Sequence, residues 1–198
     1  MIGQQALFVP DVTLPLRQRV QVEIITVAQA RYALETFHYL RRVRTGRQIN
    51  YAVLIDGVVD GVITYAYPMT SSPINGVPSD EVLEFARLYL HSNIPHTATC
   101  AIGKTIKRVA SDWMRLYPDA KTPRLVVSWS DTEYHKGTIY KAANFMWLKR
   151  SAAHAWKNEH RANTYGLRRC YPEATHIKDC WIYALTPMRS GSGGRAAR

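Results

Sequence analysis

The sequence predicts a single mixed α/β domain. Short apolar segments with the pattern of strands alternate with amphipathic segments of helical spacing, and the chain contains no internal repeat. Its 198 residues are enough for one hydrophobic core and too few for two ordinary domains. Hydrophobic residues make up 46% and charged residues 21%, as in folded globular proteins. We expect the domain to span residues 1–189, followed by a disordered Gly, Ser and Arg tail at 190–198.

The first half of the chain predicts a strand, a helix, a hairpin and another strand. The pairs Asp56-Gly57 and Asp60-Gly61 both supply turn chemistry within the hairpin. In the fourth segment, strand alternation places Phe85, Arg87 and Tyr89 on one face. The predicted strands are Val20–Val27, Tyr51–Ile55, Val58–Tyr67 and Leu83–His91, the helix is Ala28–Tyr39, and a loop rich in Ser, Pro and Gly covers Pro68–Ser79.

The second half begins with the clearest helical pattern in the chain, Thr97–Tyr117, which Pro118 ends. After it the pattern predicts a buried strand, a short helix and two more strands. These are Arg124–Ser130, Thr138–Ala143, Phe145–Leu148 and Trp181–Leu185.

The chain is strongly basic. It has 26 Lys and Arg against 15 Asp and Glu, a formal net charge of +11 at pH 7. Such a charge favours a polyanionic partner, and we expect double-stranded DNA, although a solubilising surface or contact with anionic lipid remains an alternative. The predicted DNA-binding residues are Arg41, Arg42, Arg44, Arg47, Lys149, Arg150, Arg168 and Arg169, with aromatic residues interleaved in the second group. Six to ten phosphate contacts would lower affinity roughly 10³ to 10⁵ fold between about 50 and 200 mM salt.

Neither a membrane span nor a metal site is predicted. No stretch approaches roughly 18 consecutive apolar residues, and residues 1–9 lack the pattern of a secretory signal. Cys100, Cys170 and Cys180 lack CxxC spacing, so we expect neither a disulfide framework nor a structural zinc. An iron held by scattered ligands stays open.

Polar residues at the end of one buried strand are the strongest local signal of a site. Ser128 and Asp131 lie at the carboxyl edge of the predicted sheet, where open α/β folds have their clefts. Tyr140 follows on the short helix. The alternative is structural: Ser128 then caps a turn and Tyr140 is a half-buried core aromatic.

Two resemblances to known protein families imply a function for these residues. The segment Tyr140–Phe145 is similar to the Tyr-x-x-x-Gly-Phe element of GNAT acetyltransferases, with Asn144 in place of the usual Gly. More of the chain, about Thr36–Leu148, resembles the Mom family of phage DNA-modification proteins, a diverged GNAT branch. The segments that carry this resemblance are Phe37-His38-Tyr39, Phe85–Leu90, Ser128–Asp131 and Gly137–Phe145.

The resemblance implies a GNAT-like fold with a mixed central sheet flanked by helices. It also implies that a small acyl-type group is transferred to the N6 amine of adenine in DNA, which protects phage DNA from host restriction in the cytoplasm of the bacterial host. Tyr140 would protonate the leaving thiolate. His38 or Asp131 would accept the proton from N6, with Ser128 as a relay or hydrogen-bond donor, and His38 can instead orient the substrate. Tyr39 joins the catalytic set through its place beside His38.

The donor expected from this resemblance is acetyl-CoA or a related acyl-CoA. Unpaired N–H groups at the start of the long helix suit a pyrophosphate, although an ordinary helix start is the alternative. The usual GNAT signature, Gln or Arg followed after two residues by Gly-x-Gly or Gly-x-Ala, is missing. The predicted cofactor-binding residues are Arg87, Leu88, Tyr89, Leu90, His96, Thr97, Ala98, Thr99 and Asn144.

Arg87 should have an anionic partner, because an unpaired guanidinium in mid-strand is costly. Glu84, Asp131 and a cofactor phosphate are the candidates. Two other functions remain open for the whole chain. One is a GNAT enzyme that acylates a hypermodified thymine, a small amine or a protein lysine, and the other is a non-catalytic nucleic-acid-binding module. A homodimer is also an open alternative.

Overall fold

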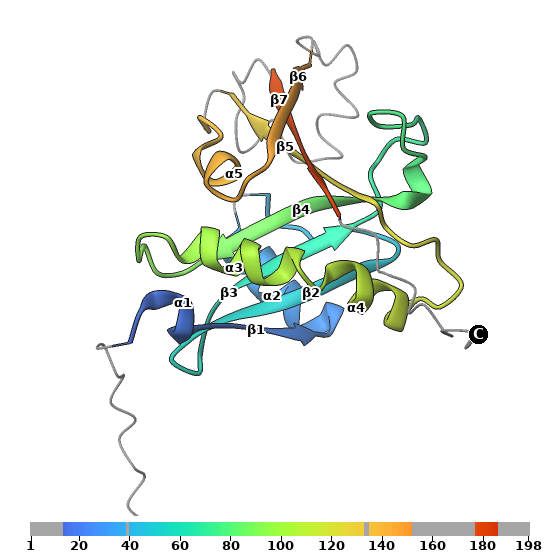
Figure 1. Ribbon diagram of the computed structural model, residues 1–198. Helices are drawn as coiled ribbons and strands as arrows, with labels where there is room; N and C mark the ends of the chain where they lie inside the picture. The colour runs from blue at the N-terminus through green and yellow to red at the C-terminus, as the bar shows by residue number, and fades with distance from the viewer. Residues whose placement is uncertain (1–13, 39, 133–134, 152–176, 186–198) are drawn as a thin grey trace, which may run out of the picture.

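The computed structural model describes residues 14–38, 40–132, 135–151 and 177–185, which form a seven-stranded mixed sheet with helices on its faces (Figure 1). The strands are β1 (Val20–Ile25), β2 (Gln48–Ile55), β3 (Val58–Ala66), β4 (Val82–Leu90), β5 (Leu125–Asp131), β6 (Met146–Arg150) and β7 (Lys178–Ala184). The helices are α1 (Leu16–Arg19), α2 (Val27–Phe37), α3 (Thr97–Ile106), α4 (Val109–Leu116) and α5 (Thr138–Ala142), with a 3₁₀ turn η1 at Ser79–Glu81. The mixed α/β fold predicted from the sequence is therefore confirmed.

The strands lie in the order β1-β2-β3-β4-β5-β7-β6. Strands β1 to β4 are antiparallel neighbours, whereas β4 and β5 pair in parallel and β7 runs antiparallel to both β5 and β6. Among the described helices, none is long and apolar enough to cross a membrane. The predictions for Tyr39, Arg168, Arg169 and the 190–198 tail lie outside the described residues.

The core of the β1–β4 region lies between the sheet and helices α3 and α4. Trp113, Tyr51 and Tyr65 are fully buried there. The two tyrosine hydroxyls are paired: that of Tyr51 donates to Asp112 at 2.9 Å, and the Tyr65 and Thr105 hydroxyl oxygens are 2.8 Å apart. The Trp113 indole N–H has no hydrogen-bond partner among the described residues. On the opposite face, α2 packs through Ala30 and Leu34, both of which are fully buried.

The single long helix predicted over Thr97–Tyr117 is wrong, because α3 and α4 are separate helices that meet at Lys107 and Arg108. The Thr105 hydroxyl bonds back to the carbonyls of the preceding turn, at 3.1 Å each, which is a bond that bends helices. Arg108 is the N-cap residue of α4, and its side chain donates a hydrogen bond to Asp112 in the first turn of that helix. The helical spacing of apolar residues does not reveal this break, because the buried residues keep the same spacing across it, from Ile106 to Val109 and Trp113.

The Asp60-Gly61 pair forms a β-bulge and no turn, which corrects the second predicted turn. Strand β3 runs on through it, and its pairing with β2 passes from Leu54–Val59 to Val53–Gly61, leaving Asp60 as an extra residue. A Cβ on Gly61 would lie 2.0 Å from the Tyr89 carbonyl oxygen, so glycine allows the close approach of β4. The Asp56-Gly57 turn is confirmed, with φ values of 53° and 78°.

A second bulge, in β4, corrects the predicted face of Phe85. The pairing with β3 passes from Tyr65–Phe85 to Thr64–Arg87, so that Ala86 is the extra residue. Phe85 therefore packs into the α3 side of the sheet, whereas Tyr89 lies with the α2 cluster. Strict alternation fails here because a bulge shifts the register by one residue.

Candidate active site between β4 and β5

The two central strands are paired for only part of their length. Their ladder consists of Val82–Leu125, Leu83–Val126 and Glu84–Val127. Beyond it β4 continues to Leu90 and β5 to Asp131, without pairing to each other. The Phe85 and Ala86 carbonyls accept side-chain hydrogen bonds there, and the part of β4 from Leu88 onward can pair with an extended ligand.

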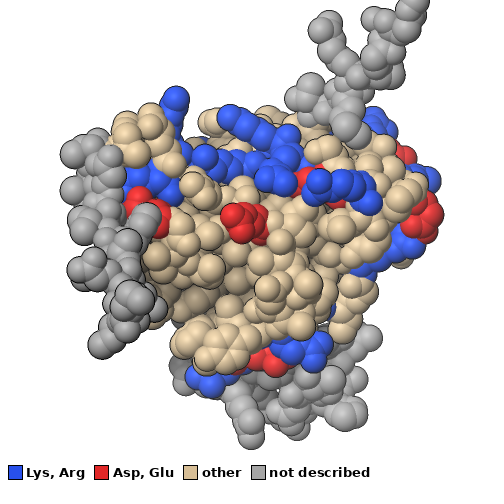
Figure 2. All heavy atoms as spheres, turned by 90° about the horizontal axis from the view of Figure 1, so that it is seen from below, with Lys and Arg blue, Asp and Glu red and all other residues tan. Residues whose placement is uncertain are grey.

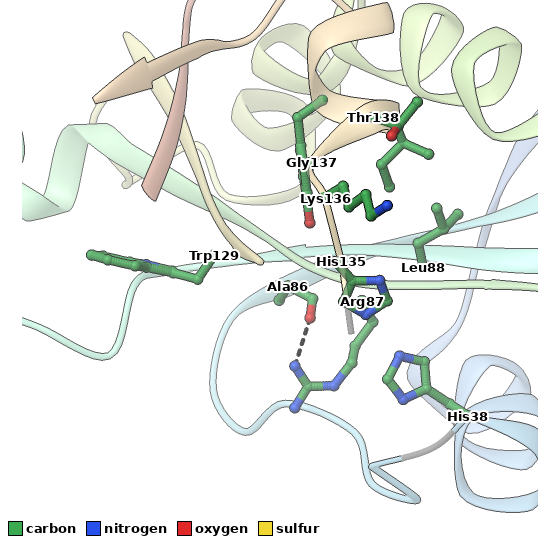
Figure 3. Close-up of a pocket in the computed structure, with 11 residues that line it drawn as sticks. His38, Ala86, Arg87, Leu88, Trp129, His135, Lys136, Gly137 and Thr138 are labelled. Atoms are coloured by element: carbon green, nitrogen blue, oxygen red, sulfur yellow. Dashed lines mark hydrogen bonds between the residues drawn. The ribbon is translucent and has the colours of Figure 1, made fainter. Parts of the chain in front are cut away.

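A cleft of about 520 Å³ occupies the gap. Figure 3 shows its wall, with His38 from the end of α2, Arg87 from β4 and the loop that leads into α5 gathered around one space. The lining residues are His38, Ala86, Arg87, Leu88, Trp129, His135, Lys136, Gly137, Thr138, Ile139 and Tyr140. No acidic residue is among these described lining residues, so the cleft is electropositive.

Ser128 and Tyr140 meet where the strands part, as the sequence placed them on neighbouring elements. The Ser128 hydroxyl is 3.0 Å from the Phe85 carbonyl oxygen and 3.0 Å from the Tyr140 hydroxyl oxygen. Because a carbonyl only accepts, the one proton of Ser128 goes to Phe85, and Tyr140 then donates to Ser128. Both residues are buried, with exposed fractions of 1% and 8%. The predicted core position of Tyr140 is confirmed, and the same residue lines the cleft, so its catalytic role stays a prediction that the geometry allows.

Helix α5 is held in place at both ends by residues in the left-handed backbone region. Gly137 begins it with φ 72°, and a Cβ there would lie 2.1 Å from the ring of Trp181. Asn144 follows it with φ 62°. The backbone N–H of Phe145 donates to the Tyr140 carbonyl at 2.9 Å, and that of Asn144 donates to Lys141 at 3.1 Å, which together form a Schellman motif. The expectation that Asn144 can take the place of glycine here is confirmed for its backbone.

Aromatic rings fix the orientation of Tyr140. Its ring stacks on Trp181, with centroids 5.6 Å apart and planes 12° apart, and meets Phe145 edge-on at 5.7 Å. The Trp181 indole N–H donates to Ser130 at 2.8 Å. From the sequence, Trp181 was predicted only as part of a strand, because its stacking partner Tyr140 lies 41 positions away and no local pattern reveals the contact.

His38 is a buried, neutral imidazole at the wall of the cleft. Burial, followed by the nearby Arg87 and His135, lowers the pKa of His38 to about 4. The backbone N–H of Leu40 donates to His38 Nδ1 at 3.1 Å, which favours the tautomer with its proton on Nε2. This state suits the predicted substrate-orienting role better than the role of general base.

Arg87 lies beside His38 and is 9% exposed. Its Nη1 donates to the Ala86 carbonyl at 2.5 Å and its Nε to the Arg42 carbonyl at 3.5 Å. Glu84, one of the three candidate partners, is bound by Arg44 at 2.9 Å. The bulge at Ala86 puts Glu84 and Arg87 on the same face of β4, and Arg44 occupies the carboxylate there.

Asp131 is the last residue of β5, and its carbonyl accepts from the backbone N–H of His135 at 2.8 Å. Ser128 and Ser130 face α5 and Trp181, whereas Val127 and Trp129 pack in a cluster on the other face of β5. Alternation places Asp131 on the same face as Trp129, which lines the cleft, although Asp131 itself is not part of the lining.

The predicted cofactor-binding residues occupy two places around the cleft. Leu88 lines it, and Tyr89 and Leu90 continue β4 beyond it. The segment His96, Thr97, Ala98 and Thr99 lies outside the lining, at the start of α3, a helix that packs against α5. The Thr97 hydroxyl there is buried and has no hydrogen-bond partner in the described part of the chain. A helix start without a side-chain cap has backbone N–H groups that can bind the phosphates of an acyl donor.

The predicted DNA-binding residues differ in how exposed their charged groups are to a nucleic acid. Arg44 is turned inward, with its side chain 11% exposed and bound to Glu84. Arg47 binds Asp119 and Arg150 binds Asp179, but both remain on the surface. Arg41 and Lys149 are exposed. Figure 2 shows Lys and Arg side chains as a band along one border of the face seen from below, while the middle of that face is largely uncharged.

The structure adds residues that the sequence did not single out. His135, Lys136 and Trp129 line the cleft. In the sequence, His135 and Lys136 belong to a polar loop between a strand and a helix, and Trp129 lies within the Ser128–Asp131 segment without a role of its own. Within the described ranges, no group of three or more His, Cys, Asp or Glu side chains is arranged to hold a metal ion.

The fold is similar to those of solved acetyltransferases. The Salmonella typhimurium yncA structure, which contains its cofactor acetyl-CoA, is 10% identical, with 89% of this chain and 99% of that one covered and a TM-score of 0.52. A Desulfovibrio desulfuricans protein assigned to the GNAT family is 9% identical, with 84% and 99% covered and a TM-score of 0.51. These similarities confirm the GNAT-like fold.

No curated protein matches the chain in sequence. The family model described as the Mom protein family does match, over residues 19–183. This range contains every described strand except the last residue of β7, together with all residues of the cleft. The chain therefore belongs to the Mom protein family.

Proposed function

We propose that this chain transfers a small acyl-type group from an acyl-CoA donor to the N6 amine of adenine in DNA, inside a bacterial host, and that the modified DNA escapes restriction. The observation that carries the proposal is the Tyr140 hydroxyl, held 3.0 Å from Ser128 at the point where β4 and β5 part. Membership of the Mom family and a net charge of +11 support a nucleic-acid acceptor. The acetyl-CoA in the similar yncA structure supports a thioester donor.

The donor supplies an acyl carbon whose bond to sulfur breaks as the bond to N6 forms, while one proton leaves N6 and another reaches the sulfur. We assign the second proton to Tyr140, whose hydroxyl hydrogen bonds to Ser128 in the absence of the donor and would turn to the sulfur when the donor is bound. Its hydrogen bond to Ser128 fixes the hydroxyl, and the bond from Ser128 to the Phe85 carbonyl fixes Ser128 in turn. Ser128 is therefore a positioning residue.

Adenine N6 is a poor nucleophile, so catalysis depends on holding it in place. The Nε2–H that the His38 tautomer provides can donate to a ring nitrogen of adenine next to the amine. His135 is exposed at the same wall and is the imidazole positioned to take the proton from N6. Arg87 and Lys136 keep the cleft positive as the base enters it.

The test is mass spectrometry of nucleosides from cells that express the protein. We expect an added mass on deoxyadenosine, and a loss of about 100-fold or more in Tyr140→Phe, because general acid catalysis contributes on that order. Tyr65→Phe is the matched control, since it removes a buried hydroxyl that bonds to Thr105 in the core. Unmodified DNA together with acylated small amines or proteins would replace this proposal with a GNAT N-acyltransferase. DNA binding without any acylation would replace it with a non-catalytic module.

A further inference from the structure

A second hollow adjoins the cleft. It measures about 440 Å³ and shares His135 and Lys136 with the cleft wall. Its other walls come from Lys141 on α5, Trp147 and Arg150 on β6, and two residues of β7. We name it the β6–β7 hollow. The two cavities lie side by side at His135 and Lys136, so a long ligand that binds over these two residues can contact both cavities.

The β6–β7 hollow has an excess of positive charge. Lys136, Lys141 and Arg150 line it, and Asp179 is its one acidic residue among those described. Asp179 is already engaged, since Arg150 donates to both of its oxygens at 2.9 and 3.1 Å. The Arg150 guanidinium also lowers the pKa of the Asp179 carboxyl. The charges left for a ligand are the two lysines, and they favour an anion.

The same hollow offers an aromatic face. The Trp147 indole N–H donates to Asp179 at 3.0 Å, so one edge of the ring is anchored, while 55% of the residue stays exposed. An anchored, exposed indole beside cations suits a ligand that alternates anionic groups with flat rings. Single-stranded or locally opened nucleic acid has this chemistry.

The geometry points to a phosphodiester in the β6–β7 hollow, next to the nucleotide whose base enters the cleft, with Trp147 stacking on the adjacent base. This inference rests on the proposed function and adds a site that binds the DNA backbone beside the target nucleotide. The phosphates of the acyl donor are the weaker match, because the start of α3 takes no part in the hollow.

The experiment measures binding of a DNA duplex by fluorescence anisotropy between about 50 and 200 mM salt. We expect Lys141→Gln to reduce the slope of log K against log salt by about 0.9, the value for one lost phosphate contact. Lys107→Gln is the matched control, because it removes an equally exposed positive charge at the end of α3, outside both cavities. Its slope should equal that of the parent.

Trp147→Leu tests the stacking. We expect at least about fivefold weaker binding to DNA whose adenine is extruded opposite an abasic site, and a smaller loss when the neighbouring base is also removed. Binding of acetyl-CoA alone, measured by calorimetry, should be the same in both variants and the parent. An unchanged salt slope in Lys141→Gln overturns the inference, and so does weaker acetyl-CoA binding with unchanged DNA binding. Neither result depends on whether adenine becomes modified, so the proposed function fails or stands separately.

Discussion

The two parts of the sheet on either side of the β4–β5 gap bury polar groups in different ways. In the β1–β4 part the buried hydroxyls of Tyr51 and Tyr65 are paired within a closed core. In the β5–β7–β6 part the buried hydroxyls of Ser128 and Tyr140 are paired at the edge of a cleft. The ladder between β4 and β5 joins the two parts through three residue pairs, and side chains such as Phe85 and Tyr140 pack across the junction. We therefore expect substitutions in the β1–β4 part to change mainly stability. Substitutions in the β5–β7–β6 part should also change the geometry of the cleft.

The largest expected effect is that of Gly137→Ala, in the β5–β7–β6 part. Alanine there is strained at φ 72°, and its Cβ would lie 2.1 Å from Trp181, the ring that stacks on Tyr140. We expect the free energy of unfolding to fall by about 4 kcal/mol, from backbone strain and overpacking together. Chemical denaturation measures it.

Gly46→Ala separates the two causes, because Gly46 has φ 78° but nothing within 4 Å of an added Cβ. It should cost only about 1 kcal/mol, the strain alone. Equal losses in the two variants would contradict a tight contact between α5 and β7. We also expect Gly137→Ala, and not Gly46→Ala, to reduce adenine modification per folded molecule.

The second effect is a dependence of stability on pH that originates in His38. Its pKa is lowered to about 4, mainly by burial. Above pH 6.5 the imidazole is neutral in both the folded and unfolded chain and contributes nothing. As the pH falls from 6.5 to 4, the unfolded chain binds a proton that the folded chain excludes, so stability decreases by at most about 3 kcal/mol.

His38→Asn should flatten the stability profile in this range, because the asparagine oxygen can still accept from the Leu40 N–H. Denaturation at a series of pH values compares the two proteins. A parent profile that is already flat between pH 6.5 and 4 would show that His38 takes up its proton freely, and its role as a neutral donor would then fail.

The third effect lies in the β1–β4 part. Asp112→Ala removes the acceptor of the fully buried Tyr51 hydroxyl, and an unsatisfied buried donor costs about 2 kcal/mol. The exposed Arg108 and Arg115 that also bind Asp112 add little. Adenine modification per folded molecule should stay unchanged, which is the opposite of Gly137→Ala.

A double-mutant cycle identifies the cause. If the loss arises because the Tyr51 hydroxyl has no acceptor, Tyr51→Phe should lower the free energy of unfolding less in the Asp112→Ala background than in the parent. Additive losses would mean that Asp112 acts instead through the start of α4.

The sequence was most informative where the rules are local. Strand and helix patterns predicted the order of the elements, and the Ser128 to Phe145 segment indicated the site. Bulges at Asp60 and Ala86 and the break between α3 and α4 were missed, because each depends on a neighbouring strand or helix. The β6–β7 hollow was missed for the same reason, since its walls come from α5, β6 and β7.

The smallest expected effect concerns Asn144, where GNAT acetyltransferases usually have glycine. Its backbone has φ 62°, and its side chain is exposed. Asn144→Gly should raise the free energy of unfolding by at most about 1 kcal/mol, and Asn144→Ala should lower it by about as much, because alanine tolerates the left-handed region least. If the side chain only completes the Schellman motif, both variants modify adenine at the parent's rate per folded molecule. A loss of modification in Asn144→Gly without a loss of stability would show instead that the Asn144 amide contacts the donor, and the helix end would then belong to the site rather than to its support.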